Sequence, residues 1–155
     1  MRLLIALGGN AIKQAAEVGT TEEQFTNCAL TARRIAQIAS RMAKNDRLII
    51  THGNGPQVGN LMAQQDSMKD RIPAQAMDVV GAMTQGQIGY MLQQTLVNSL
   101  RDAGLHLQVC AIVNQVLVSK DDPEFFGERA SKPVGNFLSE EEARLLKETH
   151  PEYVV

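Results

Sequence analysis

Two glycine-rich turns are the features of this sequence whose residue types and spacing could do chemistry. The first spans residues 8–10, and the second spans residues 53–55 within the string HGNGPQVG. Glycine lets a ligand come close to main-chain N–H groups, and a helix that follows adds free N–H donors and a dipole that favours an anion. The pattern predicts a site for a phosphate or carboxylate group, with the candidate binding residues Gly8, Gly9, Asn10, Gly53, Asn54 and Gly55.

The spacing of the glycines excludes the commoner phosphate-binding motifs. The sequence contains no GxxxxGK[ST], so the turns are not a P-loop. Gly53, Gly55 and Gly59 are spaced one residue too widely for the dinucleotide fingerprint, and no suitable acidic residue follows about 20 positions later. An ordinary tight turn would also use glycine. Two such turns, each following a strand, favour the binding interpretation.

These turns require strands before them and helices after them. Residues 3–7 are a short, almost wholly apolar run, which is typical of a parallel strand covered on both faces, and residues 47–51 are interpreted as a second strand. Between them, Thr20 with Glu23 and Thr21 with Gln24 both have capping-box spacing ahead of an apolar helical stripe. Strand, turn, helix and strand in this order predict a right-handed βαβ unit. Both turns then lie at the carboxyl edge of the sheet, where α/β proteins bind ligands.

The rest of the chain continues the α/β pattern. Gly104 is placed to end a long helix, and Gly81, Gly86 and Gly89 within that helix indicate close packing or a break near Gly81. A capping box at Ser139 opens a short last helix. The expected elements are helices at about residues 58–68, 76–103 and 139–147, a strand at 108–118 and a polar segment at 119–137.

Composition narrows the class of protein. The 155 residues carry 15 Lys+Arg against 17 Asp+Glu, and 44% are hydrophobic. This size fits about one domain or part of a larger one, and the near-neutral charge argues against a nucleic-acid partner. No apolar stretch is long enough to cross a membrane. Cys28 and Cys110 have neither disulfide-framework nor metal-ligand spacing, so we expect no metal site and a cytoplasmic location.

The motifs as a set resemble carbamate kinase, a branch of the amino acid kinase family. The resemblance is highly specific, because its motifs occur in family order across residues 3–138. They are ALGGNA at 6–11, HGNGPQVG at 52–59, QGQIGYMLQ at 85–93, DDPEF at 121–125 and KPVG at 132–135.

The resemblance implies a fold, a reaction and roles for residues. The fold is α/β, a three-layer αβα sandwich with a mainly parallel sheet, and the reaction is ATP + carbamate ⇌ ADP + carbamoyl phosphate. In that family both turns line the site for carbamate and the transferred phosphoryl group. The lysine that matches Lys132 reaches in from a protruding subdomain, here at about residues 119–138, to neutralise charge. ATP/ADP with Mg²⁺ as cofactor and a homodimer are implied in the same way.

The sequence departs from the family pattern in three respects. Residues 13–17 lack the usual Arg and Gly, and residues 132–138 have Asn136 and Leu138 where the family has Pro and Tyr. The third departure is length. We therefore expect residues 1–155 to be the N-terminal, acceptor-substrate part of such a domain, with the nucleotide-binding part absent.

Two other functions stay open at the level of sequence. One is a catalytically inactive remnant that binds small anions or acts as an interaction module. The other is an amino acid kinase with a different carboxylate acceptor, which the string at residues 52–59 argues against. His52 is interpreted as structural, because phosphoryl transfer to a carbamate oxygen needs no general base.

Overall fold

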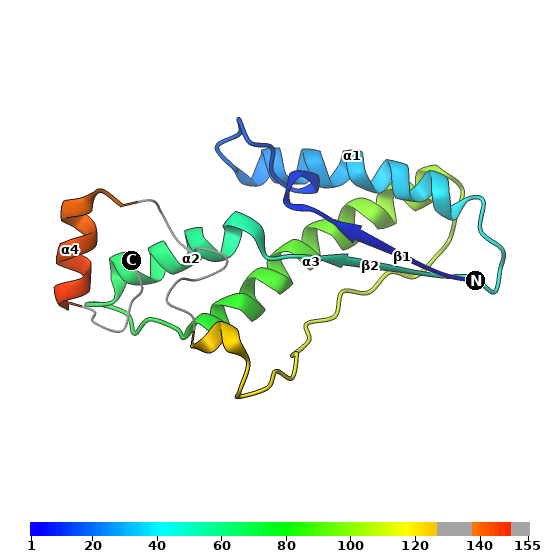
Figure 1. Ribbon diagram of the computed structural model, residues 1–155. Helices are drawn as coiled ribbons and strands as arrows, with labels where there is room; N and C mark the ends of the chain where they lie inside the picture. The colour runs from blue at the N-terminus through cyan, green and yellow to red at the C-terminus, as the bar shows by residue number, and fades with distance from the viewer. Residues whose placement is uncertain (127–137, 150–155) are drawn as a thin grey trace.

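The computed structural model describes residues 1–126 and 138–149. Figure 1 shows two neighbouring strands with long helices packed beside them. In these residues the predicted βαβ order and the three later helices are confirmed. The elements are β1 (Arg2–Leu7), η1 (Gly9–Ala11), α1 (Thr21–Ala39), β2 (Arg47–His52), α2 (Gly55–Met68), α3 (Met77–Asp102), η2 (Pro123–Phe125) and α4 (Glu140–Thr149).

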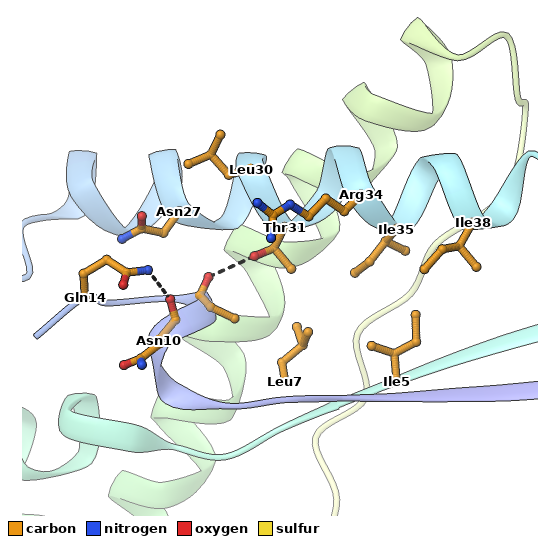
Figure 2. A pocket seen from close by; sticks show the side chains of 11 residues that line it. Ile5, Leu7, Asn10, Gln14, Asn27, Leu30, Thr31, Arg34, Ile35 and Ile38 are labelled. Atoms are coloured by element: carbon orange, nitrogen blue, oxygen red, sulfur yellow. Dashed lines mark hydrogen bonds between the residues drawn. The ribbon is translucent and has the colours of Figure 1, made fainter.

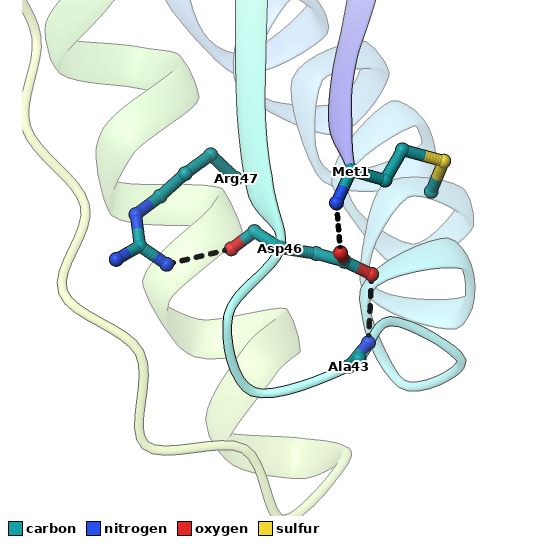
Figure 3. A network of polar contacts seen from close by, with 4 residues as sticks. All are labelled: Met1, Ala43, Asp46 and Arg47. Atoms are coloured by element: carbon teal, nitrogen blue, oxygen red, sulfur yellow. Dashed lines mark hydrogen bonds and ion pairs between the residues drawn. The ribbon is translucent and has the colours of Figure 1, made fainter.

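β1 and β2 are parallel, and their register runs from Arg2 opposite Arg47 to Leu7 opposite His52. Asp46 fixes the beginning of this pairing (Figure 3). Its carboxylate accepts hydrogen bonds from the amino group of Met1 and, at 2.9 Å, from the backbone N–H of Ala43. The bond to the amino group is the main reason why the pKa of Asp46 is lowered. This contact ties the beginnings of the two strands together.

Of the two capping boxes predicted for the first helix, the one formed by Thr20 and Glu23 is confirmed. Thr20 Oγ1 accepts from the Glu23 N–H at 3.3 Å, and the Glu23 carboxylate accepts from the N–H groups of Thr20 at 2.9 Å and Gly19 at 2.7 Å. These backbone donors lower the pKa of Glu23. The cap fixes where α1 begins.

The core lies on one face of the two strands. Ile5 and Ile50 pack against a cluster of buried residues from α1 and α3, which include Ile35 and Leu96. On the opposite face Leu4 is 58% exposed and Ile49 is 46% exposed. The expectation that both faces are covered is therefore wrong for the described residues, because α1 and α3 pack on the same face.

α3 is continuous through its glycines, so the structure shows no break near Gly81. Gly89 does reflect close packing, since a Cβ at this position would lie 2.9 Å from the Cβ of Ala111. The predicted stop is confirmed at Gly104, which has φ +72° and donates its N–H to the Arg101 carbonyl at 2.9 Å. A left-handed residue after the last turn is a common way to end a helix.

The predicted strand at residues 108–118 is wrong, because residues 105–119 contain no strand. Glutamine side chains of α3 contact this backbone in place of a neighbouring strand. Gln93 Nε2 donates to the Val109 carbonyl at 2.8 Å, and Gln85 Oε1 accepts from the Asn114 N–H at 3.0 Å. These contacts hold the segment along α3.

The last described helix, α4, begins with the predicted capping box. Ser139 Oγ donates to the Glu142 carboxylate at 2.6 Å and accepts from the Glu142 N–H at 3.3 Å. Among the residues that the structure describes, none of the helices is both long enough and apolar enough to cross a bilayer.

Candidate functional site

The two glycine turns follow neighbouring strands at one edge of the sheet. β1 ends at Leu7 and β2 at His52, and these residues are paired in the parallel register. Gly8 and Gly53 therefore leave the sheet side by side, at about the 5 Å spacing of neighbouring strands. Both glycines are exposed. The common edge predicted for the two turns is confirmed, whereas ligand binding by their residues stays a prediction.

The first turn uses its carbonyl groups internally and leaves N–H groups open. The Gly8 carbonyl accepts from the Ala11 N–H at 3.0 Å, and the Gly9 carbonyl accepts from Ile12 at 2.9 Å and Lys13 at 3.0 Å. The N–H groups of Gly9 and Asn10 have no acceptor within the described ranges. They head a short 3-10 helix, where such donors are unpaired by geometry.

Side chains of α1 hold the first turn in place. Thr31 Oγ1 donates to the Ala11 carbonyl at 3.3 Å (Figure 2). Asn27 Nδ2 donates to the Ile12 carbonyl at 3.2 Å. Asn27 also donates to the Glu17 carboxylate at 2.7 Å. The sequence analysis missed both anchors. Their signal is a polar pair four residues apart that borders the apolar stripe of α1.

The second turn is anchored by a different helix. Asn54 is the N-cap of α2 but makes no capping bond. Its Nδ2 donates at 2.8 Å to both the Gly81 carbonyl and the Thr84 hydroxyl of α3. Gly55 has φ +48°, a conformation that favours glycine, and its N–H has no acceptor in the described part of the chain. His52 Nδ1 lies 2.9 Å from the Gly53 carbonyl, so it contacts the backbone of its own turn.

A cleft of about 500 Å³ lies between β1 and α1, beside the first turn (Figure 2). Ile5, Leu7 and Ile35 make its apolar wall, and Asn10 lies at its polar end. No residue of the second turn lines it. The cleft is therefore a neighbour of the predicted site and does not contain both turns.

Two of the sequence predictions concern groups that the structure does not place. Lys132 lies outside the described residues. Mg²⁺ prefers several oxygen ligands, usually carboxylates and phosphates. Within residues 1–126 and 138–149, no three His, Cys, Asp or Glu side chains lie close enough together to hold a metal ion. These residues do not fit a protein-held Mg²⁺.

An α/β fold with two glycine turns at one sheet edge is typical of proteins that bind ligands at the carboxyl edge of a parallel sheet. Sequence comparison identifies the family within this class. Residues 1–143 match the sequence model of the amino acid kinase family, and the chain belongs to that family. Within the family it is 52% identical over 147 residues to the carbamate kinase of Thermococcus kodakarensis and 49% identical to that of Pyrococcus furiosus. Each match covers 94% of this chain and 45% of the relative.

Solved structures agree with this assignment. Carbamate kinase of Giardia lamblia bound to AMP-PNP matches 97% of this chain and 46% of its own, with a TM-score of 0.83 and 36% identity. A protein of Aeropyrum pernix matches with a TM-score of 0.87 and 36% identity, over 47% of its length. The predicted amino acid kinase-like α/β fold and the resemblance to the N-terminal part of carbamate kinase are confirmed. The chain spans about half the length of the relatives it matches.

Proposed function

We propose that this chain provides the acceptor-substrate site of the reaction ATP + carbamate ⇌ ADP + carbamoyl phosphate. The observation that carries the proposal is the pairing of Leu7 with His52, which brings two turns with open N–H groups to one sheet edge. The similarity to carbamate kinases supports carbamate as the acceptor.

For this reaction the site has to position the substrate and stabilise the negative charge of the transferred phosphoryl group. The transferred phosphoryl group spreads negative charge over its oxygens, and preorganised donors stabilise it without a covalent nucleophile. Backbone N–H groups around Gly8, Gly9, Gly53 and Gly55 would supply these donors. We assign orientation of the substrate to Asn10 and, through the conformation of its turn, to Asn54. Lys132 would neutralise the moving charge.

The cofactor and the assembly belong to the same proposal. ATP or ADP with Mg²⁺ is proposed because the chain belongs to a kinase family, and because one relative was solved with AMP-PNP. A homodimer is proposed on the family resemblance alone. The main alternative is a remnant that binds an anion but supports no transfer.

The proposal is tested by measuring carbamoyl phosphate binding to the 155-residue chain by isothermal titration calorimetry. A Cβ at Gly9, Gly53 or Gly86 would meet no atom within 4 Å, so alanine fits the fold at all three. We expect Gly9→Ala and Gly53→Ala to weaken binding, because a methyl group blocks approach to the turns, and Gly86→Ala on α3 to leave it unchanged. No saturable binding by the wild-type chain, or equal effects of all three variants, would contradict the proposal.

A coupled assay that follows ATP formation from ADP and carbamoyl phosphate separates enzyme from remnant. ATP formation by this chain alone would exclude the alternative that the chain is a catalytically inactive remnant. Binding without ATP formation is expected if the nucleotide site lies in the part of the relatives that this chain does not match.

A further inference from the structure

We propose that Thr84 is a positioning residue of the second glycine turn. Its hydroxyl holds the Asn54 side chain on α3 and so keeps that side chain away from the first N–H groups of α2. Those N–H groups then remain open to the ligand. This inference rests on the proposed function, because it concerns the same anion-binding turn.

Three hydrogen bonds fix the arrangement. Thr84 is 0% exposed, and its Oγ1 donates to the Gly81 carbonyl at 2.9 Å. With its hydrogen used in this way, the hydroxyl oxygen can only accept, and it accepts from Asn54 Nδ2 at 2.8 Å. Asn54 Nδ2 also donates to the Gly81 carbonyl at 2.8 Å. Both amide hydrogens of Asn54 are therefore committed to α3.

The two bonds to α3 accompany a backbone conformation of Asn54 that leaves α2 without a side-chain cap. Asparagine is among the best N-cap residues, and its side-chain oxygen normally accepts from the N–H two or three positions into the helix. Asn54 is the N-cap of α2, yet it has φ −89° and ψ −11° and makes no such bond. The N–H groups of Gly55 and Gln57 consequently have no acceptor among the described residues.

Without the Thr84 hydroxyl, Asn54 loses one of its two anchors on α3. Asn54 is then free to relax to the extended backbone conformation of a capping residue and to cap α2 with its side-chain oxygen, where it would compete with an anionic ligand for the same N–H groups. The expected loss of affinity is about tenfold, which is the usual effect of one hydrogen bond on binding.

Thr95 offers a matched control on the same helix. It is also buried, and its hydroxyl donates only to carbonyls of α3 itself, at 2.8 Å to Met91 and 3.2 Å to Leu92. Thr95→Val removes a buried hydroxyl of the same kind without contact to the turn. Thr84→Ser keeps the hydroxyl and serves as the conservative variant.

The test measures carbamoyl phosphate affinity and the Asn54 side-chain amide signals in ¹⁵N NMR spectra of the full chain. We expect Thr84→Val to weaken binding about tenfold and to shift the Asn54 signals, whereas Thr84→Ser and Thr95→Val leave both unchanged. Equal losses of affinity in Thr84→Val and Thr95→Val, or no rescue by serine, would overturn the inference.

Failure of the proposed function is distinguishable from failure of this inference. If the wild-type chain binds no carbamoyl phosphate, the proposed function fails, and the open N–H groups have no assigned ligand. The hydrogen bond between Thr84 and Asn54 is then tested by the NMR signals of the Asn54 side-chain amide alone. Asn54 side-chain signals that stay unchanged in Thr84→Val overturn the positioning role in either case.

Discussion

The side chains of Gln24 and Gln57 form a buried hydrogen bond between α1 and α2. Gln57 Nε2 donates to Gln24 Oε1 at 2.9 Å, and Gln24 Nε2 donates to the Gly19 carbonyl at 2.7 Å. Because the Gly19 carbonyl can only accept, it sets the orientation of both amides. Gln57 Oε1 is buried without a partner among the described residues. The pair links the loop after the first turn to the helix that begins at the second.

A double-mutant cycle on this pair tests whether it joins the two turn-bearing units. Gln24→Leu leaves Gln57 buried with an unpaired amide, so we expect a loss of about 1–3 kcal/mol in the free energy of unfolding. Adding Gln57→Leu removes that unpaired group, and the double variant should lose less than the sum of the single losses. Urea unfolding measures all three values. Strict additivity would show that the two side chains do not interact.

Two glycines of α3 should respond in opposite directions to alanine. A Cβ at Gly86 meets nothing within 4 Å, so Gly86→Ala should stabilise the helix by about 0.5–1 kcal/mol. A Cβ at Gly89 would lie 2.9 Å from the Ala111 Cβ, so Gly89→Ala should destabilise the protein by about 1–3 kcal/mol. Thermal unfolding of the two variants and the wild type measures both changes in stability. A stabilising Gly89→Ala would mean that residues 105–119 do not pack against α3.

The cap of α1 predicts a pH dependence of stability. Backbone N–H groups of Thr20 and Gly19 lower the pKa of Glu23 below its ordinary value of 4.5. The carboxylate therefore stabilises the folded chain above that ordinary value, and this contribution is lost as the pH falls through the lowered pKa. Glu23→Gln should be less stable than wild type at pH 7, with a difference that shrinks towards pH 3. Melting temperatures across this range measure it, and a constant difference would argue against a charged cap.

Local sequence patterns predicted much of the frame of this site. The capping residues Thr20 and Glu23, the stop at Gly104 and the order of strands and helices all depend on neighbours a few residues apart. The common sheet edge follows from that order, because parallel strands with a helical crossover present the same ends together. The position of both glycine turns at one sheet edge therefore follows from local patterns alone.

What the patterns missed depends on contacts between distant residues. Thr84 is 30 positions from Asn54, and Thr31 is 20 positions from Ala11. Nothing in the local sequence indicates which helix anchors which turn. The same limit applies to residues 108–118, which have a strand-like composition but form no strand and contact the side chains of Gln85 and Gln93. It also applies to the strands, since periodicity does not reveal that α1 and α3 choose the same face.

The central claim is that the two turns bind one small anion together. Titration of the ¹⁵N-labelled chain with carbamoyl phosphate tests it most directly, because each backbone N–H reports separately. We expect the amide signals of Gly9, Asn10, Asn54 and Gly55 to shift with a single dissociation constant, while those of α4 do not move. Shifts confined to one turn, different dissociation constants for the two turns, or no shifts at either would contradict it.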